Sequence, residues 1–319
     1  MIVTEHATRE NFSASGYLQA NADVAEAARN GVTDPWHHFV EFGENEGRMQ
    51  IAATFLAGRS TYGHAKYERF KDCVLTAERP STSFHFLEES EAFPVALSER
   101  HLSASEYAAE SANNGYGPFI DEVRMNPSKA YLDVGCGLRN EVFDNCLYVE
   151  VYPSLTADVI VAPDCRYPLA SAAFDGIGCF AVLEHVTKPW VVASEIHRML
   201  KPGGRCYIAW PFLQPIHGFP SHYFNATRQG LELLFSERFE IEVCRTEPWE
   251  GPNHTMNWVL GKFADRLPPQ KRERLLRMSV AELIAQVPAS PFWTELLSDL
   301  PDAVISEFAC GNSLIATKK

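Results

Sequence analysis

Between residues 130 and 210 the hydrophobic positions form short apolar runs that alternate with a helical pattern. Continuous apolar runs are typical of parallel strands that are buried on both faces. After the fourth run, Pro189 begins a helix in which Trp190, Val191 and Ile196 lie on an apolar face. This alternation predicts a doubly wound α/β sheet. In chain order the predicted strands read AYLDV, CLYVEV, ADVIVAPD, FDGIGCF and RCYIAWPF.

The first fifty residues carry a different pattern, which is dense in helix start and stop signals. Asn21 can cap a short helix over Ala22–Arg29, and Gly31 follows it, where a left-handed residue is favoured. Asp34 followed by Pro35 is a second helix start. We therefore expect two or three short helices that bury their aromatic side chains against each other or against the next domain.

These patterns divide the chain into three predicted parts. We expect a small helical module over residues 1–50, a linker or helical extension over 51–112, and an α/β domain over 113–319. Ser60–Lys66, within the extension, is predicted as a loop, and residues 254–300 are expected to form a helical insertion in the α/β domain. The chain ends in a strand-like segment that reads EFACGNSLIATKK.

The charge balance limits the classes of partner. Lys and Arg total 28 against 41 Asp and Glu, which gives a net charge of −13. This balance disfavours nucleic acid and anionic membrane surfaces as partners. The first twenty residues lack the apolar core of a secretory signal, and no run is long enough for a membrane span. The eight cysteines form no C-x-x-C pair, so reduced thiols in the cytoplasm are expected.

The strongest chemical signal is the turn after the first strand, which reads LDVGCG. Gly135 and Gly137 follow Asp133 at the carboxyl end of that strand, where ligands bind in open α/β sheets. Glycine lets a ligand approach the backbone closely because no Cβ intervenes. The turn lacks the Lys-Ser/Thr end of a P-loop and the third glycine of the dinucleotide fingerprint.

The order of these segments resembles a class I S-adenosylmethionine-dependent methyltransferase. The resemblance covers roughly residues 113–246, and the closing strand less firmly. It rests on the segments LDVGCG, YVEV, PD, FDGIGCFAVLEHV, EIHRMLKPGG and PFLQPIHGFPSHYFNAT. It implies a Rossmann-like methyltransferase fold with S-adenosylmethionine as cofactor.

The resemblance also assigns cofactor contacts. Asp133 and the Gly135–Gly137 turn would border the methionine portion, and Glu150 would accept hydrogen bonds from the ribose hydroxyls. Asp164 would accept from the adenine amino group, and Phe180 would contact the sulfonium end. Three alternatives stay open: a turn-forming role for Asp133, a charge at the sheet edge for Glu150, and a solvated loop carboxylate for Asp164. The full cofactor set is Asp133, Gly135, Cys136, Gly137, Glu150, Asp164, Cys165 and Phe180.

One departure from the family pattern affects the fold. Only Pro153–Ala157 joins the second strand to the third, whereas parallel neighbours normally need a crossover of a dozen or more residues. The helix between these strands is therefore predicted to be missing, and the third strand to be short or irregular. The adenine side of the pocket should then be more open than in larger relatives.

Candidate catalytic residues must lie at the same edge of the sheet. His217 is the favoured general base for a hydroxyl acceptor, and His185, after the fourth strand, is the alternative. Tyr223 is a candidate hydrogen-bond donor to the acceptor. No group of residues at metal-ligand spacing stands out, so no metal is expected.

The predicted function is transfer of a methyl group from S-adenosylmethionine to a hydroxyl of a small molecule or saccharide. The saccharide hypothesis rests on residues 17–48, which resemble a helical module of bacterial surface-polysaccharide proteins through the pattern Y-L-x-x-N-x-D-V, D-P, H-F and E-G-R. That module could bind a protein partner, or only pack. Alternatives are an inactive scaffold in glycan assembly and a nicotinamide-dependent enzyme, and a homo-oligomer stays open.

Overall fold

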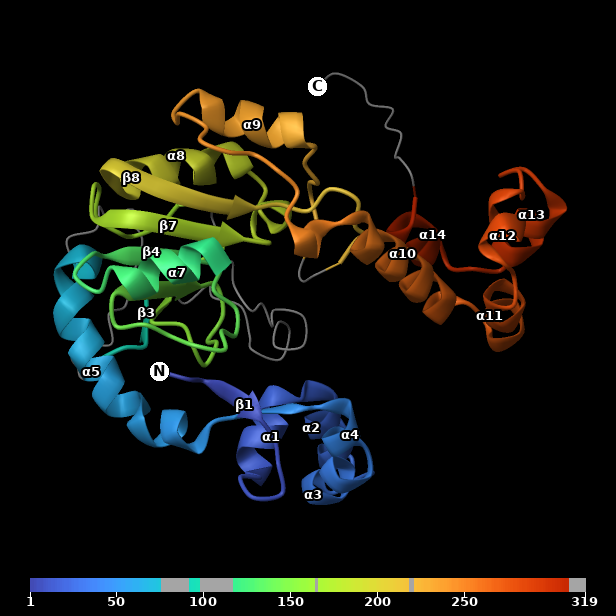
Figure 1. Cartoon of the computed structure of the whole chain (residues 1–319), viewed down its shortest axis with the longest axis horizontal. Helices are drawn as coiled ribbons and strands as arrows, with labels where there is room; N and C mark the ends of the chain where they lie inside the picture. The colour runs from blue at the N-terminus through green and yellow to red at the C-terminus, as the bar shows by residue number, and fades with distance from the viewer. Residues whose placement is uncertain (76–91, 98–116, 164–165, 218–220, 310–319) are drawn as a thin grey trace, which may run out of the picture. The chain divides into compact units, whose positions relative to one another are not determined.

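The computed structural model describes residues 1–75, 92–97, 117–163, 166–217 and 221–309 (Figure 1). The chain divides into two compact units. The first comprises Met1–Trp210 and Gly218–Ile241, and the second comprises Pro211–His217 and Glu242–Lys319. None of the helices in these described ranges is both long and apolar enough to cross a membrane.

A six-stranded sheet forms the centre of the first unit, in the order β3-β6-β5-β4-β7-β8. All neighbouring strands pair in parallel. From β4 the chain moves first toward β5 and β6 and then back to β7 and β8, so β4 and β7 flank the switch point of a doubly wound fold. The predicted α/β fold class is confirmed. The strands are β3 (Val95–Ala96), β4 (Tyr131–Val134), β5 (Cys146–Glu150), β6 (Val159–Ile160), β7 (Phe174–Phe180) and β8 (Leu200–Ala209).

The crossover from β5 to β6 contains no helix, as the short connection predicted. Residues 151–158 alone link these strands, and β6 is only two residues long. Inside this loop Ser154 Oγ and Thr156 Oγ1 donate to the Gly137 carbonyl, over 2.6 and 2.7 Å. The crossover therefore folds back onto the glycine turn.

A helix from earlier in the chain takes the place of the missing one. α5 (Ala53–Leu75) packs Tyr67, Phe70 and Val74 into the hydrophobic core that includes residues of β4, β5, β6 and β7. The prediction of a loop over Ser60–Lys66 is wrong, because this segment lies in the middle of α5. Residues 51–112, predicted as a linker or helical extension, thus contribute a long helix and also β3.

Helices cover both faces of the sheet, and a hydrophobic core lies between the sheet and the helices on each face. One core joins α5 to α8 (Pro189–Met199) and includes Phe235 of α9 (Arg228–Ser236). The other joins α7 (Gly117–Met125) to Tyr131, Tyr148 and Phe180. Figure 1 shows the strands side by side with α7 over β4. The short helix η2 (Leu183–His185) follows β7 directly.

The N-terminal module contains the predicted helices together with a small antiparallel ribbon. The helix over Ala22–Arg29 is confirmed, and Gly31 has φ +68°. Asp34 Oδ1 accepts the backbone N–H of Trp36 and His37 at the second predicted helix start. The elements are β1 (Thr4–His6), α1 (Ala14–Ala20), α2 (Ala22–Arg29), α3 (Pro35–His38), η1 (Phe39–Gly43), α4 (Glu44–Glu46) and β2 (Met49–Ile51).

The second unit is helical in its described part, in agreement with the helical pattern predicted around 254–300. Its core contains Ala264, Leu267, Leu275, Phe292 and Leu296. The strand-like end of the chain lies outside the described residues from 310 onward. The elements are η3 (Pro248–Glu250), α10 (Pro252–Arg266), α11 (Pro269–Leu276), α12 (Val280–Ile284), α13 (Pro291–Leu297) and α14 (Asp302–Glu307).

Candidate active site

The glycine turn lies at the carboxyl end of β4, as the sequence predicted. Gly135 and Gly137 have φ values of +68° and +57°, in the left-handed region that favours glycine. The N–H groups of Gly135 and Cys136 both donate to the Val149 carbonyl, so the turn stays joined to β5. A Cβ at Gly135 would lie 2.2 Å from Cγ2 of Val182, so packing against the segment after β7 also requires glycine there.

Glu150 lies beside this turn, at the end of β5. Its Oε2 accepts the Gly137 N–H over 2.8 Å, and its Oε1 accepts the Val151 N–H over 2.7 Å. Burial raises the pKa of the carboxyl group to about 7, although these two N–H groups favour the ionised form. A carboxylate oxygen has two lone pairs, so each oxygen of Glu150 can still accept a hydroxyl hydrogen bond.

Asp133 forms an ion pair with Arg139, a residue that the sequence analysis did not single out. Arg139 Nε donates to Asp133 Oδ2 and Nη2 donates to Oδ1, each over 2.8 Å. Both side chains are only 3% exposed. The guanidinium carbon also lies 5.8 Å from the ring centroid of Phe180. The residues predicted at the methionine and sulfonium ends of a cofactor therefore both contact Arg139.

Cys136 and Phe180 are both buried in this region. Phe180 ends β7 and its ring centroid lies 5.6 Å from that of Phe119 in α7. Burial raises the pKa of the Cys136 thiol well above its usual value. The Cys136 thiol is therefore not a reactive group, and the residue contributes to the turn through its backbone.

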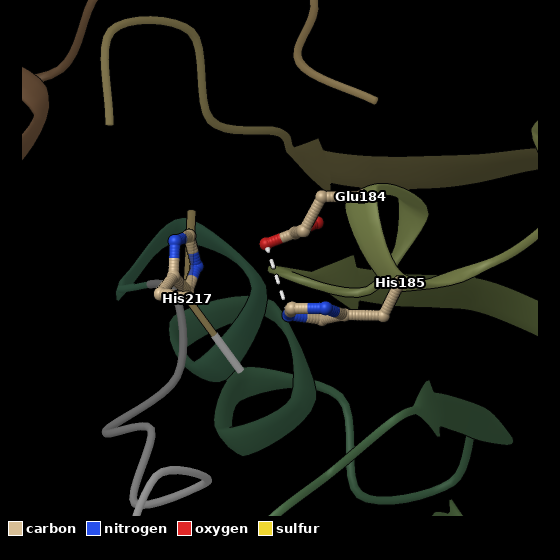
Figure 2. Close-up of side chains that lie close together, drawn as sticks. All are labelled: Glu184, His185 and His217. Atoms are coloured by element: carbon tan, nitrogen blue, oxygen red, sulfur yellow. Dashed lines mark ion pairs between the residues drawn. The ribbon is translucent and has the colours of Figure 1, made fainter. Parts of the chain in front are cut away.

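The segment after β7 brings a buried carboxyl group next to an imidazole (Figure 2). Glu184 is fully buried, and burial raises its pKa to about 8. His185 Nε2 lies 3.8 Å from Glu184 Oε1, and His185 Nδ1 lies 2.8 Å from the Ser221 carbonyl oxygen. A carbonyl can only accept, so Nδ1 carries the proton and Nε2 is the basic nitrogen of neutral His185.

The loop after β8 is tied to this segment through its backbone. The N–H groups of Tyr223 and Phe224 both donate to the Glu184 carbonyl, over 2.6 and 3.4 Å. The Tyr223 side chain is 48% exposed. The segments that follow β7 and β8 thus hold His185 and Tyr223 near one another within the first unit.

His217, the favoured base, belongs to the second unit. Its Nδ1 lies 2.9 Å from the Pro215 carbonyl oxygen, and its ring centroid lies 4.9 Å from that of Trp258. Its Nε2 is therefore also the basic nitrogen in the neutral form. Asp164 and Cys165, predicted at the adenine, lie outside the described residues.

A cavity of about 1000 Å³ lies in the first unit between α8 and α9. Trp190, Trp210 and Phe224 supply aromatic lining, and the Trp210 indole N–H donates to the Phe224 carbonyl over 3.2 Å. Because Phe224 is also bonded to Glu184 through its backbone, the cavity borders the loop that follows β8. Pockets of this size and lining are typical of small-molecule sites.

Sequence reasoning missed Arg139 and the burial of Glu184. The pairing of Arg139 with Asp133 depends on how the chain turns between them, and no pattern in the five residues that separate them indicates it. The signal for Glu184 was present, since it lies shortly after an apolar strand, β7, much as Glu150 lies at the end of β5.

The sheet and the glycine turn define the chain as a Rossmann-like α/β protein. A comparison with known protein families points to a more specific class within this fold. A family described as "Methyltransferase domain" matches residues 132–208, the range that includes the turn, Glu150 and the Glu184–His185 segment. Among curated proteins none matches the chain.

Parts of the chain also align with solved structures. One is phosphoethanolamine N-methyltransferase 2 of Haemonchus contortus in complex with S-adenosyl-L-methionine, at 18% identity and a TM-score of 0.32, over 59% of this chain and 49% of the other. This chain thus spans about half the length of that enzyme. Another is the [4+2]-cyclase SpnF, at 16% identity and a TM-score of 0.31, over 66% of this chain and 84% of the other.

Proposed function

We propose that the chain is an S-adenosylmethionine-dependent methyltransferase. The observation that supports this most is the glycine turn with Glu150 hydrogen-bonded to it at the carboxyl edge of the sheet. A positive-φ turn gives a ligand access to the backbone, and the adjacent carboxylate can accept two hydroxyl groups, as a ribose requires. The family match over residues 132–208 supports the same function.

The chain's own residues would bind and orient the cofactor, which supplies an activated methyl group on a sulfonium. Asp133, Cys136 and the two glycines of the turn would hold the methionine end, and Glu150 the ribose. Asp164 and Cys165 would contact the adenine, and Phe180 the sulfonium. Asp133 and Glu150 lie on the paired parallel strands β4 and β5, which supports this binding mode.

A hydroxyl acceptor needs a base to take its proton, and the two candidate bases are His185 and His217. Both have Nε2 as the basic nitrogen, since each Nδ1 faces a carbonyl oxygen. His185 has the further advantage that it lies in η2, the first helix after β7, at the sheet edge where the glycine turn also lies. Tyr223 would donate a hydrogen bond to the acceptor.

The acceptor would be a small molecule or a saccharide that carries a hydroxyl group. The cavity lined by Trp190, Trp210 and Phe224 has the size and the aromatic walls to hold a ring. The resemblance of the N-terminal module favours polysaccharide biosynthesis in the cytoplasm, with that module as the surface for a protein partner.

A second candidate function is a non-catalytic scaffold with a methyltransferase-like fold. It is favoured by the bidentate Asp133–Arg139 pair, which engages one of the proposed cofactor residues inside the protein. The two functions differ in turnover: a scaffold would bind cofactor, or nothing, without methylating any acceptor.

Calorimetric titration with S-adenosylhomocysteine tests the proposal. We expect micromolar binding by the full chain and at least tenfold weaker binding by Glu150→Gln, which corresponds to about 1.4 kcal/mol. Glu122→Gln is the matched control, because Glu122 bonds Tyr131 at the opposite, amino end of β4. Absence of binding by the unmodified chain would refute the cofactor assignment.

Turnover then separates the two candidate functions. Transfer of a labelled methyl group to one member of a panel of saccharides and small hydroxyl compounds is expected, and His185→Gln should abolish it while binding of S-adenosylhomocysteine persists. Tight binding with no transfer to any compound would favour the scaffold.

A further inference from the structure

The cavity between α8 and α9 has an aromatic end at the carboxyl edge of the sheet. All of its lining residues belong to the first unit. The rings of Trp190 and Phe224 lie 6.4 Å apart between centroids at an interplanar angle of 66°, and Trp210, which follows β8, is bonded to Phe224 through its indole N–H. Trp190 is 53% exposed. These rings therefore offer apolar faces that a ligand can cover.

Hydrogen-bond donors lie along both walls of the cavity. On α8, Trp190 and Ser194 are four residues apart and so share one face of the helix. Within the described part of the chain, neither the Trp190 indole N–H nor the Ser194 hydroxyl has a hydrogen-bond partner. At the start of α9, Thr227 Oγ1 accepts the Gly230 N–H, and its hydroxyl proton has no acceptor among the same residues. A ligand with several oxygen atoms would satisfy these three donors.

The charged side chains of the lining, by contrast, compensate one another. Arg198 pairs with Glu195 over 2.8 Å, and Arg238 pairs with Glu237 over 3.1 Å. Arg166 is the remaining charged residue of the lining, and it is exposed, so water and salt screen its charge. The cavity therefore favours a ligand that is polar without being charged.

We propose that this cavity binds the methyl acceptor as a neutral saccharide of two or more sugar rings. A sugar ring carries C–H groups on its faces, which pack against an aromatic side chain, and hydroxyl groups around its rim, which accept hydrogen bonds. The aromatic end and the three donors match both parts of such a ring. The inference rests on the methyltransferase proposed above, and it names the class of acceptor.

The length of the cavity indicates more than one ring. Its lining follows α8 from Trp190 to Arg198, a rise of about 12 Å over eight residues. Its volume of about 1000 Å³ lies at the upper end of the range for small-molecule pockets. The ring at the aromatic end would receive the methyl group, because the Phe224 N–H bonds the carbonyl of Glu184, the neighbour of His185. Further rings would lie along α8 toward Arg198.

Other neutral ligands fit the lining less well. A flat aryl compound could stack on Trp190 but would cover the hydroxyls of Ser194 and Thr227 without bonding them. An acyl chain would do the same along the whole of α8. Covering a hydroxyl without a partner is unfavourable, since its hydrogen bonds to water are lost and not replaced.

A printed array of neutral glycans tests the inference on the full chain. The array would hold mono- to tetrasaccharides of hexoses, deoxyhexoses and N-acetylhexosamines, and calorimetry would then measure the affinities within any series that binds. We expect at least one series to bind, with the trisaccharide at least fivefold tighter than the monosaccharide. Binding of no glycan, affinities independent of length, or tighter binding of catechol than of any glycan would overturn the inference.

Titration of the same protein with S-adenosylhomocysteine separates this inference from the proposed function. If S-adenosylhomocysteine binds and no glycan does, the saccharide acceptor is refuted and the methyltransferase proposal stands. If a glycan binds and S-adenosylhomocysteine does not, the methyltransferase proposal fails, and with it the role of the glycan as acceptor.

Variants assign the binding to the cavity. Trp190→Leu should weaken binding of the trisaccharide at least tenfold and Ser194→Ala about threefold. His197→Leu is the matched control for the first, because His197 is an exposed ring on the same helix outside the cavity lining. Ser236→Ala is the control for the second, since Ser236 lies on α9 and donates to the Leu233 carbonyl. Both controls should stay within twofold of the unmodified chain, and equal losses in variants and controls would overturn the assignment.

Discussion

Glu184 is the residue whose burial gives the clearest pH dependence. Its pKa is raised to about 8 in the folded chain, against about 4.3 in an unfolded one. Between these values the folded state binds more protons, so the free energy of unfolding falls as pH rises. Glu184→Gln removes this titration and should flatten the decline by up to about 1.4 kcal/mol per pH unit. Urea unfolding at pH 5, 6, 7 and 8 measures the slope.

Glu150 also has a raised pKa, of about 7, so its titration lowers the free energy of unfolding as pH rises. It is present in both the unmodified chain and the Glu184→Gln variant. Some decline with pH is therefore expected even in the Glu184→Gln variant. Glu232→Gln, at an exposed position paired with Arg228, should leave the slope unchanged. If Glu184→Gln and the unmodified chain lose stability equally between pH 5 and 8, Glu184 is ionised in the folded state and our account of its burial is wrong.

Sequence alone predicted those site residues whose position follows from where a strand ends. Gly135, Gly137 and Glu150 each lie just past an apolar run, and the structure has them at the carboxyl ends of β4 and β5. Arg139 could not be found in this way. Its partner is fixed by the three-dimensional course of the turn, and an arginine in a loop usually lies in solvent.

Among the elements, α5 shows why the sheet was predicted better than its covering helices. Strands are recognised from local apolar runs, but Gly58, Ser60 and Gly63 give the middle of α5 the composition of a loop. Gly63 is required by close packing, since a Cβ there would lie 2.3 Å from the Phe93 carbonyl oxygen. Such a requirement comes from a segment thirty residues away, and tertiary packing then overrides local propensity.

The contact of α5 with the short crossover depends on one buried ion pair. Lys66 Nζ lies 2.5 Å from Asp158 Oδ2 and 4.2 Å from the ring centroid of Tyr148, and the Lys66 side chain is fully buried. Lys66→Met leaves the Asp158 carboxylate buried without its cation, so we expect a loss of about 3–5 kcal/mol in the free energy of unfolding. Chemical denaturation measures this loss.

A double-mutant cycle isolates the pair. Adding Asp158→Asn to Lys66→Met removes the second charge, and it should recover a large part of the lost stability. Lys71→Met is the control on the same helix, since Lys71 pairs with Glu68 at the surface and should change stability by less than about 1 kcal/mol. If the effects of Lys66→Met and Asp158→Asn simply add, the two side chains do not stabilise each other.

At the scale of the whole molecule, the N-terminal module and the α/β sheet form parts of one compact unit. The link is backbone pairing that no sequence pattern indicated. The N–H groups of Val3 and Thr4 donate to the Asn140 carbonyl over 2.8 and 3.3 Å, and Thr4 Oγ1 donates to Asn140 Oδ1 over 2.7 Å. Val3 is fully buried and shares a core with Phe180. The start of the module is thus bonded to the residue next to Arg139.

This link predicts that the module responds to the ligand of the glycine turn. If a ligand fixes Arg139, local opening of residues 139–142 becomes rarer, and the amides that donate to Asn140 should open less often as well. We expect S-adenosylhomocysteine to slow amide hydrogen exchange at Val3 and Thr4 together with the turn. The helices α11 to α13 of the second unit, which have their own core, serve as the internal control and should not change. Slower exchange confined to residues 133–150 would show that the module is joined to the turn without being coupled to it.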